Sequence, residues 1–270
     1  MTVATTKLPP WFKQKLPDME KVRDMQRFFR EGGLHTVCES AHCPNLGECW
    51  GKGVATFMIL GDRCTRACRF CAVEAGRPLT VDENEPYQVA MAVQRLNLNY
   101  VVITSVARDD LADEGAIHFA KTIFQIRRIA PKTKIEVLIP DLSAKTENIQ
   151  IVIDAKPEVI SHNLETVRRL SRKVRPQAGY ERSLEVLKII KRLDVSVISK
   201  SSLMVGLGET KEEMREAMQD LLNVGCDILT VGQYPSPSQS RRHLPVENFV
   251  SPDEFETYRQ EGLRLGFKHV

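Results

Sequence analysis

Residues 56–71 read TFMILGDRCTRACRFC. The first five residues of this stretch form a continuous apolar run that ends at a glycine, which is typical of a buried strand. Three cysteines, Cys64, Cys68 and Cys71, follow the run with the spacing C-x3-C-x2-C. The stretch therefore predicts a strand that leads directly into a cysteine-rich loop.

Strand-like and helix-like segments alternate through six units from this stretch onward. Predicted strands cover 56–60, 100–104, 135–139, 159–162, part of 195–203, and 228–233. Predicted helices cover 86–96, 114–129, 146–155, 182–193, 211–222 and 252–265. The alternation predicts an α/β fold with a parallel sheet, either a partial (β/α)6 barrel or a doubly wound sheet. Both folds place the functional site at the carboxyl ends of the strands.

One helix and the N-terminal region deserve separate predictions. In helix 114–129, Ile117, Ala120 and Phe124 form one apolar stripe.

Residues 1–54 differ from the rest because they contain a charged helix candidate and a second group of cysteines. We therefore expect two parts, an N-terminal cysteine-rich extension over 1–54 and the α/β domain over 55–270.

Composition narrows the class of protein. The chain has 270 residues, of which 42% are hydrophobic and 27% charged, with a net charge of +3. This charge is too small to indicate nucleic acid or a membrane surface as a partner. No apolar run reaches the roughly 18 residues that a membrane helix needs. The first ten residues lack the apolar core of a secretory signal, so we expect a reducing, cytoplasmic location.

That expected location changes the interpretation of the cysteines. Disulfides do not persist in a reducing compartment. Six of the seven cysteines lie between residues 38 and 71, and only Cys226 lies outside. Crowded thiols of this kind indicate metal binding. Cys226 follows a predicted helix and precedes a strand, so we expect it to be a buried core thiol.

The C-x3-C-x2-C loop has the pattern of an incomplete cluster site. A cubane iron–sulfur cluster normally takes four cysteines, so three leave one iron open to a substrate or cofactor. A structural zinc site is the alternative, but zinc usually has four ligands, and no fourth Cys or His follows at a suitable distance. Nothing here resembles a thioredoxin-like C-x-x-C that opens a helix, which argues against a redox disulfide.

The pattern C-x3-C-x-Phe-C after the first strand of a β/α chain resembles the radical S-adenosylmethionine superfamily. The resemblance implies a partial barrel in which Cys64, Cys68 and Cys71 are catalytic and hold a 4Fe-4S cluster, with Phe70 beside the bound cofactor. S-adenosyl-L-methionine would chelate the open iron and be cleaved to a 5′-deoxyadenosyl radical. Such radical chemistry belongs to the cofactor, and the protein supplies its position and excludes water.

The second cysteine group, Cys38, Cys43 and Cys49, is spaced C-x4-C-x5-C within E-S-A-H-C-P-N and G-E-C-W. Within the superfamily this group resembles the lipoyl synthase family, and so do the stretches at 8–11, 104–111, 162–166, 174–176, 201–209 and 232–246. The resemblance thus covers nearly the whole chain. It implies that these cysteines hold an auxiliary 4Fe-4S cluster. His35 and His42 lie nearby, and we expect them to be hydrogen-bond partners and not ligands.

The family resemblance also implies a reaction and partners. Family members insert two sulfur atoms at C6 and C8 of a protein-bound octanoyl group, and the auxiliary cluster supplies the sulfur. The partners would be an octanoylated lipoyl-carrier domain or glycine cleavage H protein, and a one-electron donor such as ferredoxin or flavodoxin. The family carries an Arg-Ser-Ser-Tyr motif near its C terminus whose serine ligates the auxiliary cluster. This sequence lacks the motif, so either the sequence is truncated or that cluster has an unfilled iron.

Residues at the predicted strand ends are candidates for contacts with S-adenosyl-L-methionine. Ser105 could bond its methionyl end, with Arg108 as support for a carboxylate. Asn163 and Glu165 suit its amino or ribose groups, because a carboxylate can accept two ribose hydroxyls. The alternative for Asn163 is helix capping.

Several basic residues have two possible roles. Arg175 and Lys200 could reach a carboxylate of the cofactor, although single basic residues are usually solvated. Arg168, Arg169, Arg172, Lys173 and Arg175 form a basic cluster. It is either a solvated helix face or a docking surface for an acidic carrier domain.

Three other functions can be considered from the sequence. The sequence argues against a biotin synthase relative, because that family lacks the upstream C-x4-C-x5-C group. A paralogue that acts on another acyl substrate would share every motif. A two-cluster electron carrier would not cleave S-adenosylmethionine and would not need six β/α units.

Overall fold

The computed structural model describes residues 9–12, 19–40, 49 and 54–270. Six parallel strands form the centre of the fold: β2 (Val54–Ile59), β5 (Tyr100–Ser105), β6 (Lys134–Leu138), β7 (Val159–Ser161), β8 (Ile198–Val205) and β9 (Ile228–Gln233). They lie in the order β2-β5-β6-β7-β8-β9, so each strand pairs with the next one along the chain. A doubly wound sheet would reverse its order at a switch point. The sequential order therefore confirms the partial (β/α)6 barrel.

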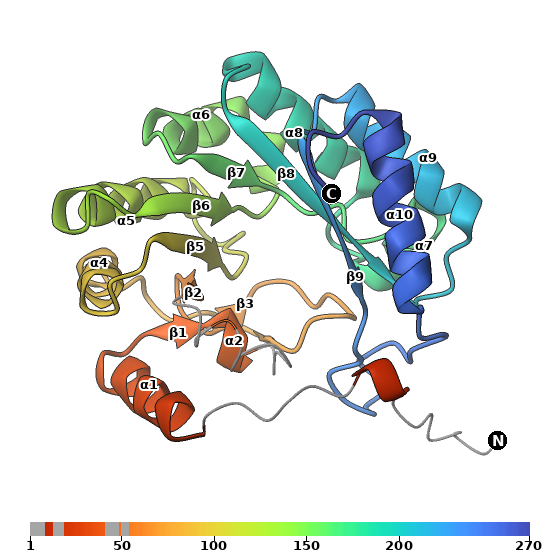
Figure 1. Ribbon diagram of the computed structural model, residues 1–270. Helices are drawn as coiled ribbons and strands as arrows, with labels where there is room; N and C mark the ends of the chain where they lie inside the picture. Colours follow the sequence, from red (N-terminus) through yellow and green to blue (C-terminus); the bar gives the residue numbers. More distant parts are fainter. Residues whose placement is uncertain (1–8, 13–18, 41–48, 50–53) are drawn as a thin grey trace.

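Helices cover the outer side of the curved sheet (Figure 1). They are α4 (Glu85–Arg95), α5 (Ala116–Ile129), α6 (Thr146–Asp154), α8 (Tyr180–Leu193), α9 (Lys211–Asn223) and α10 (Pro252–Leu265). Each lies within about two residues of its predicted range. A short helix, α7 (Arg168–Val174), and the two 3-10 turns η1 (Pro10–Phe12) and η2 (Leu142–Ala144) were not predicted. None of the helices in the described ranges is long and apolar enough to cross a bilayer.

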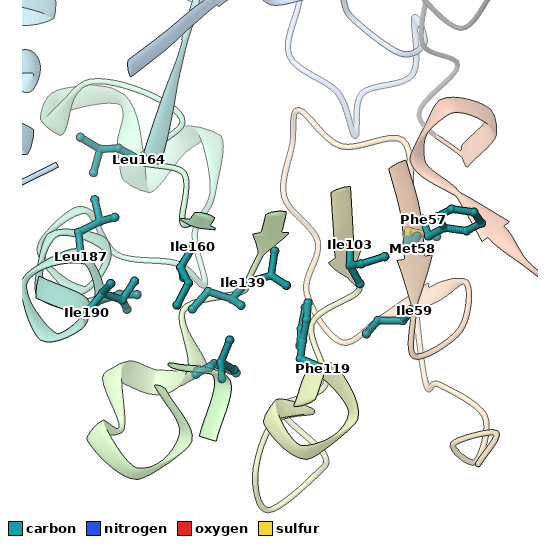
Figure 2. Packing of buried hydrophobic residues seen from close by; sticks show 14 of the residues in the cluster. Phe57, Met58, Ile59, Ile103, Phe119, Ile139, Ile160, Leu164, Leu187 and Ile190 are labelled. Atoms are coloured by element: carbon teal, nitrogen blue, oxygen red, sulfur yellow. The ribbon is translucent and has the colours of Figure 1, made fainter. Parts of the chain in front are cut away.

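The hydrophobic core lies between the strands and these outer helices. Figure 2 shows Ile103 and Ile160 from two strands close to Phe119, Leu187 and Ile190 from the helices. All five side chains are at most 3% exposed. Alternate residues of each strand enter this layer, because successive side chains point to opposite faces. The other set faces the inside of the barrel.

The apolar stripe predicted for α5 does not face the core. Ile117 and Phe124 are 48% and 64% exposed, whereas Phe119, Ile123 and Ile126 are fully buried. The helix is apolar on more than one side, so periodicity alone could not choose its buried face. Packing against α4 and the sheet selects the second stripe.

The described part of the N-terminal extension packs on the first barrel strand. It comprises α1 (Met19–Glu31), β1 (His35–Thr36) and α2 (Val37–Ser40), and β1 pairs antiparallel with β2. The Phe29 ring meets Phe57 edge-on at 5.6 Å between centroids. Phe29 and Cys38 therefore belong to the same core as the barrel. The division at residue 54 stays a prediction, although β2 begins there.

Candidate functional site

The three cysteines of the first group lie on a loop that is closed at its base. Two short parallel strands, β3 (Arg63–Cys64) and β4 (Glu74–Ala75), pair with each other. The Gly76 amide also donates to the Cys64 carbonyl at 2.9 Å. We call residues 64–75 the cysteine loop. It follows β2, so it lies at the carboxyl ends of the strands, as predicted.

A strained turn leads from β2 into the cysteine loop. Leu60 has φ +69°, which is unusual for a residue with a side chain, and Gly61 follows with φ +93°. The Leu60 amide donates to Glu85 Oε2 at 2.8 Å, and Arg108 Nη1 donates to the Leu60 carbonyl at 3.3 Å. His118 Nε2 contacts the same Glu85 oxygen at 2.7 Å. These buried side chains hold the turn from both sides. Arg108 was a candidate to support a cofactor carboxylate, but here it donates to the Leu60 carbonyl and to Asp110.

Arg66, within the cysteine loop, ties the loop to the ends of β5 and β6. Its Nε and Nη2 donate to Asp109 at 2.5 to 3.1 Å, and Nη1 and Nη2 donate to the two oxygens of Asp141 at 2.8 Å each. Arg66 is 8% exposed and the Asp141 side chain is fully buried. The guanidinium lowers the pKa of both carboxyl groups through hydrogen bonds and charge, against the opposing effect of burial. Both aspartates are therefore ionised partners of one buried cation.

Two further segments hold the opposite side of the loop. The Arg69 amide donates to the Val174 carbonyl at 2.8 Å, and the Ala67 amide donates to Gln177 Oε1 at 2.7 Å. From the segment after β9, the Leu244 amide donates to the Arg69 carbonyl at 3.1 Å. These two segments fix the loop on this side through main-chain hydrogen bonds and one to the Gln177 side chain.

The thiols of the loop suit a group that compensates negative charge. Burial raises the pKa of Cys68 to about 12, and the neighbouring Cys71 and Cys64 add to the rise, while Arg175 opposes it. Burial also raises the pKa of Cys71. The amides of Arg66 and Ala107 point at Cys64 Sγ from 3.4 and 3.3 Å. Three thiolates here would repel each other unless a metal centre were bound, so the donor set fits an iron–sulfur cluster. No three His, Cys, Asp or Glu side chains of the described residues converge on a single metal ion.

The second cysteine group lies only partly within the described residues. Cys38 is in α2 and 7% exposed, and Cys49 is half-buried. Cys43 and His42 lie outside the described residues. The auxiliary-cluster site therefore stays a prediction.

Three candidate cofactor residues lie at the strand ends, and Phe70, which the family resemblance indicated, lies on the cysteine loop. Ser105 is the last residue of β5, and its buried hydroxyl has no hydrogen-bond partner among the residues that the structure describes. Asn163 and Glu165 follow β7, and their side chains are hydrogen-bonded to each other. Phe70, on the loop, packs against the hydrophobic core.

Glu165 has an unusual backbone and an unusual environment. Its φ of +67° is in the left-handed region, which is costly for a non-glycine residue and is often found at functional sites. Burial raises the pKa of its carboxyl group, while Arg175 and Asn163 oppose the rise. Asn163 does not cap a helix, because α7 begins at Arg168 with Val167 in the capping position.

Lys200 lies inside the barrel. Its Nζ contacts Glu136 at 2.8 Å, and Glu136 also accepts hydrogen bonds from Tyr100 at 2.6 Å and Ser161 at 2.7 Å. Lys200, Glu136 and Tyr100 line a cavity of about 960 Å³ that runs along β9. Lys200 was predicted to reach a carboxylate of the cofactor, and the carboxylate that it meets here belongs to the protein.

The basic cluster divides between the surface and the interior. Arg168 pairs with Glu181 and Asp220, and Arg169 donates to Glu213 at 2.6 and 2.9 Å. Arg175, by contrast, is 3% exposed and belongs to the site. The cluster is therefore not one continuous basic face. Cys226 is 3% exposed, which confirms the predicted core thiol.

Comparison with known proteins shows the family of the chain. A family model described as the radical SAM superfamily matches residues 58–221. The chain is 51% identical over 265 residues to the lipoyl synthase of Caldicellulosiruptor saccharolyticus, covering 98% of this chain and 92% of that protein. It is 52% identical to the lipoyl synthase of Phocaeicola vulgatus, with the same two coverages. The chain belongs to the lipoyl synthase family. It is thus a member of an enzyme family. The alternative of a non-catalytic electron carrier with two clusters loses its support.

Solved structures agree with this member of the lipoyl synthase family at the level of the fold. The maturase HydG superposes with a TM-score of 0.61 at 14% identity, covering 92% of this chain and 64% of that one. Methylornithine synthase gives 0.60 at 15% identity, covering 80% and 63%. At these identities the likeness shows the fold alone.

Sequence reasoning missed several residues that shape the site in this family member. Arg66 lies between two of the predicted ligands, and Asp109 and Asp141 both follow strands. The strand-end rule could have found the two aspartates. Ser183 lies in the first turn of a predicted helix, where no pattern distinguishes it from other polar residues.

Proposed function

We propose that the chain is a lipoyl synthase that inserts two sulfur atoms at C6 and C8 of a protein-bound octanoyl group. The observation that carries the proposal is about 50% identity to curated lipoyl synthases over nearly the whole chain. The site geometry supports it, because the three thiols lie on a fixed loop at the open end of a partial barrel.

Cys64, Cys68 and Cys71 would hold a 4Fe-4S cluster. When bound, such a cluster supplies the electron that cleaves S-adenosyl-L-methionine and starts the radical chemistry. The protein's part is positional. The Leu60 turn and Arg66 fix the loop, and the packed core behind it excludes water from that side.

The cofactor contacts proposed for the strand ends rest on unsatisfied or strained groups. Ser105 offers a buried hydroxyl that has no protein partner. Glu165 is held in a left-handed conformation and could accept the ribose hydroxyls, with Asn163 beside it. Arg175 has an unpartnered Nε that could donate to a carboxylate. Lys200 has less support as a cofactor contact, because Glu136 already pairs with it.

Cys38, Cys43 and Cys49 would hold the auxiliary 4Fe-4S cluster that provides sulfur. The partners would be an octanoylated lipoyl-carrier domain or glycine cleavage H protein, and ferredoxin or flavodoxin as the electron donor. The family's Arg-Ser-Ser-Tyr serine is not in this sequence, so no fourth ligand is assigned. A cytoplasmic location is part of the same proposal.

An anaerobic assay tests the function. The protein is reconstituted with iron and sulfide and incubated with S-adenosylmethionine, a reductant and an octanoylated lysine peptide. We expect about eight irons per chain and a lipoylated peptide. Cofactor cleavage without sulfur insertion would favour a paralogue with another acyl substrate. Bound zinc, or no cleavage at all, would overturn the proposal.

Two variants separate the roles of the cysteine groups. We expect Cys68→Ala to abolish cleavage of S-adenosylmethionine, because it removes a ligand from the loop. We expect Cys43→Ala to leave cleavage intact and to stop sulfur insertion. Cleavage is followed by the release of 5′-deoxyadenosine, and insertion by the mass of the peptide. Equal loss of cleavage in both variants would contradict the assignment of the two groups.

A further inference from the structure

Arg175 is a buried cation beside the cysteine loop. It follows Val174, whose carbonyl accepts the amide of Arg69, the residue after Cys68, so the main chain brings Arg175 close to the cysteine loop. Its charge counteracts the rise in the pKa of the Cys68 thiol. Only 3% of Arg175 is exposed, so water screens this interaction little.

The hydrogen bonds of Arg175 leave its charge without an ion-pair partner. Nη1 donates to the Asn163 carbonyl at 3.0 Å and Nη2 to Ser183 Oγ at 2.5 Å, while Nε has no partner in the described part of the chain. Among the described residues, no carboxylate accepts a hydrogen bond from Arg175, although Glu165 is close enough to act through its charge. The guanidinium is therefore held by neutral groups.

A directional chain of hydrogen bonds orients one of those groups. His162 Nδ1 lies 2.9 Å from the Ile139 carbonyl, so this nitrogen must carry the proton. Burial and the charge of Arg175 lower the pKa of His162 to about 4, so the ring is neutral and Nε2 is an acceptor. The Ser183 hydroxyl, 2.9 Å away, donates to Nε2. The Ser183 oxygen then accepts the hydrogen bond from Arg175 Nη2.

We propose that Ser183 and His162 are positioning residues that hold the Arg175 guanidinium beside Cys68 and thereby raise the reduction potential of the cluster on the cysteine loop. The inference rests on the proposed function, since it requires that cluster. Reduction adds one negative charge to the cluster. A fixed cation nearby in a poorly solvated site stabilises the reduced form, because the charge interaction is stronger there than in water.

A potentiometric titration tests the proposal. The anaerobically reconstituted protein is poised at a series of potentials, and the reduced cluster is measured by electron paramagnetic resonance. The signal that changes on addition of S-adenosylmethionine identifies the cluster of the cysteine loop. We expect Arg175→Met to shift its midpoint potential to a more negative value. Ser183→Ala should shift it in the same direction by less, and Ser183→Thr, which keeps the hydroxyl, should restore it.

Ser171→Ala is the matched control. Ser171 is a buried serine one turn before Arg175, and its hydroxyl has no hydrogen-bond partner. Its removal should leave the potential unchanged. An unchanged potential in Ser183→Ala, or loss of iron there while Ser171→Ala keeps its iron, would overturn the positioning role. No shift in Arg175→Met would overturn the role of the charge. Failure of the proposed function would differ, because the unmodified protein itself would then show no signal that responds to S-adenosylmethionine.

Discussion

Two buried arginines, one within the cysteine loop and one beside it, have different surroundings. Arg66 lies on the side of β5 and β6 and donates to two ionised aspartates, Asp109 and Asp141. Arg175 lies on the side of β7 and donates to a main-chain carbonyl and to the Ser183 hydroxyl. The side chains are 8% and 3% exposed, so both charges are removed from water to a similar degree.

The difference separates two uses of a buried cation. Two carboxylates neutralise Arg66 within its own network, so that network acts mainly as a tie between the loop and the strand ends. Arg175 donates to neutral groups, and Glu165 acts on it through charge without a hydrogen bond, so its charge can still act on the thiols nearby. The two sides should therefore respond differently to substitution, with stability changing most at Arg66 and electronic properties changing most at Arg175.

The largest effect on stability is expected from Arg66→Met. The substitution leaves the buried Asp141 with the longer contact from Arg182, at 3.4 Å, and the hydrogen bond from the Ser143 amide, at 3.1 Å. Breaking a buried ion pair from one side typically costs roughly 3 to 5 kcal/mol. Urea unfolding of the metal-free protein measures this loss.

Arg169→Met is the matched control for that measurement. Arg169 also makes two hydrogen bonds to one carboxylate, but its side chain is 56% exposed. Exposed pairs of this kind contribute about 0 to 1 kcal/mol. A loss at Arg66 no greater than at Arg169 would show that the Arg66 network is not the tie described above.

The sequence predicts the scaffold well because long apolar strands and their connecting helices carry strong periodic signals. Six strands with helices between them were located, and the strand-end rule then placed Ser105, Asn163 and Glu165 correctly. The very short strands β3 and β4 have no such signal, since two residues cannot show a period. Helix α7 was missed because charged residues fill most of its length.

Side-chain destinations were harder to predict than backbone elements. Lys200 was predicted to reach a carboxylate of the cofactor, but it lies within β8, which runs from Ile198 to Val205, and its side chain pairs with Glu136. The sequence shows Arg66 inside the cysteine loop and Arg108 shortly after the second predicted strand. Nothing in their spacing reveals that Arg66 pairs with two aspartates and that Arg108 holds a turn. These contacts depend on the three-dimensional meeting of strand ends.

The second prediction uses pH to separate the two sides of the loop. The Arg175 side contains His162, whose pKa is lowered from 6.5 to about 4 by burial and by Arg175. In the unfolded chain this histidine takes up a proton below pH 6.5, whereas in the folded chain it stays neutral until about pH 4. The folded state therefore loses about 2 kcal/mol between pH 7 and pH 5 from this residue alone.

Urea unfolding at pH 7 and pH 5 measures that loss, with His162→Gln as the comparison. The variant should show a smaller loss of stability over the same interval. The Arg66 side contributes no change in stability between pH 7 and pH 5. The pKa values of Asp109 and Asp141 are lowered from 3.8, so these residues lose their stabilising effect only below about pH 3.8. Equal pH dependence in the two proteins would mean that His162 is not held neutral, and the hydrogen-bond direction at Ser183 would then be wrong.

The smallest effect is expected from Asp109→Asn, which tests how the Arg66 network is divided. Asp109 is 39% exposed and Asp141 is fully buried, and both bind the same guanidinium. An asparagine oxygen at 109 can still accept from Arg66, and water can reach the group, so the loss should be about 1 kcal/mol. Asp141→Asn should cost more in the same urea titration, because the buried amide nitrogen would face Arg66 without an acceptor. If the two losses are equal, the tie depends on the number of carboxylates around Arg66 and not on which of them is buried.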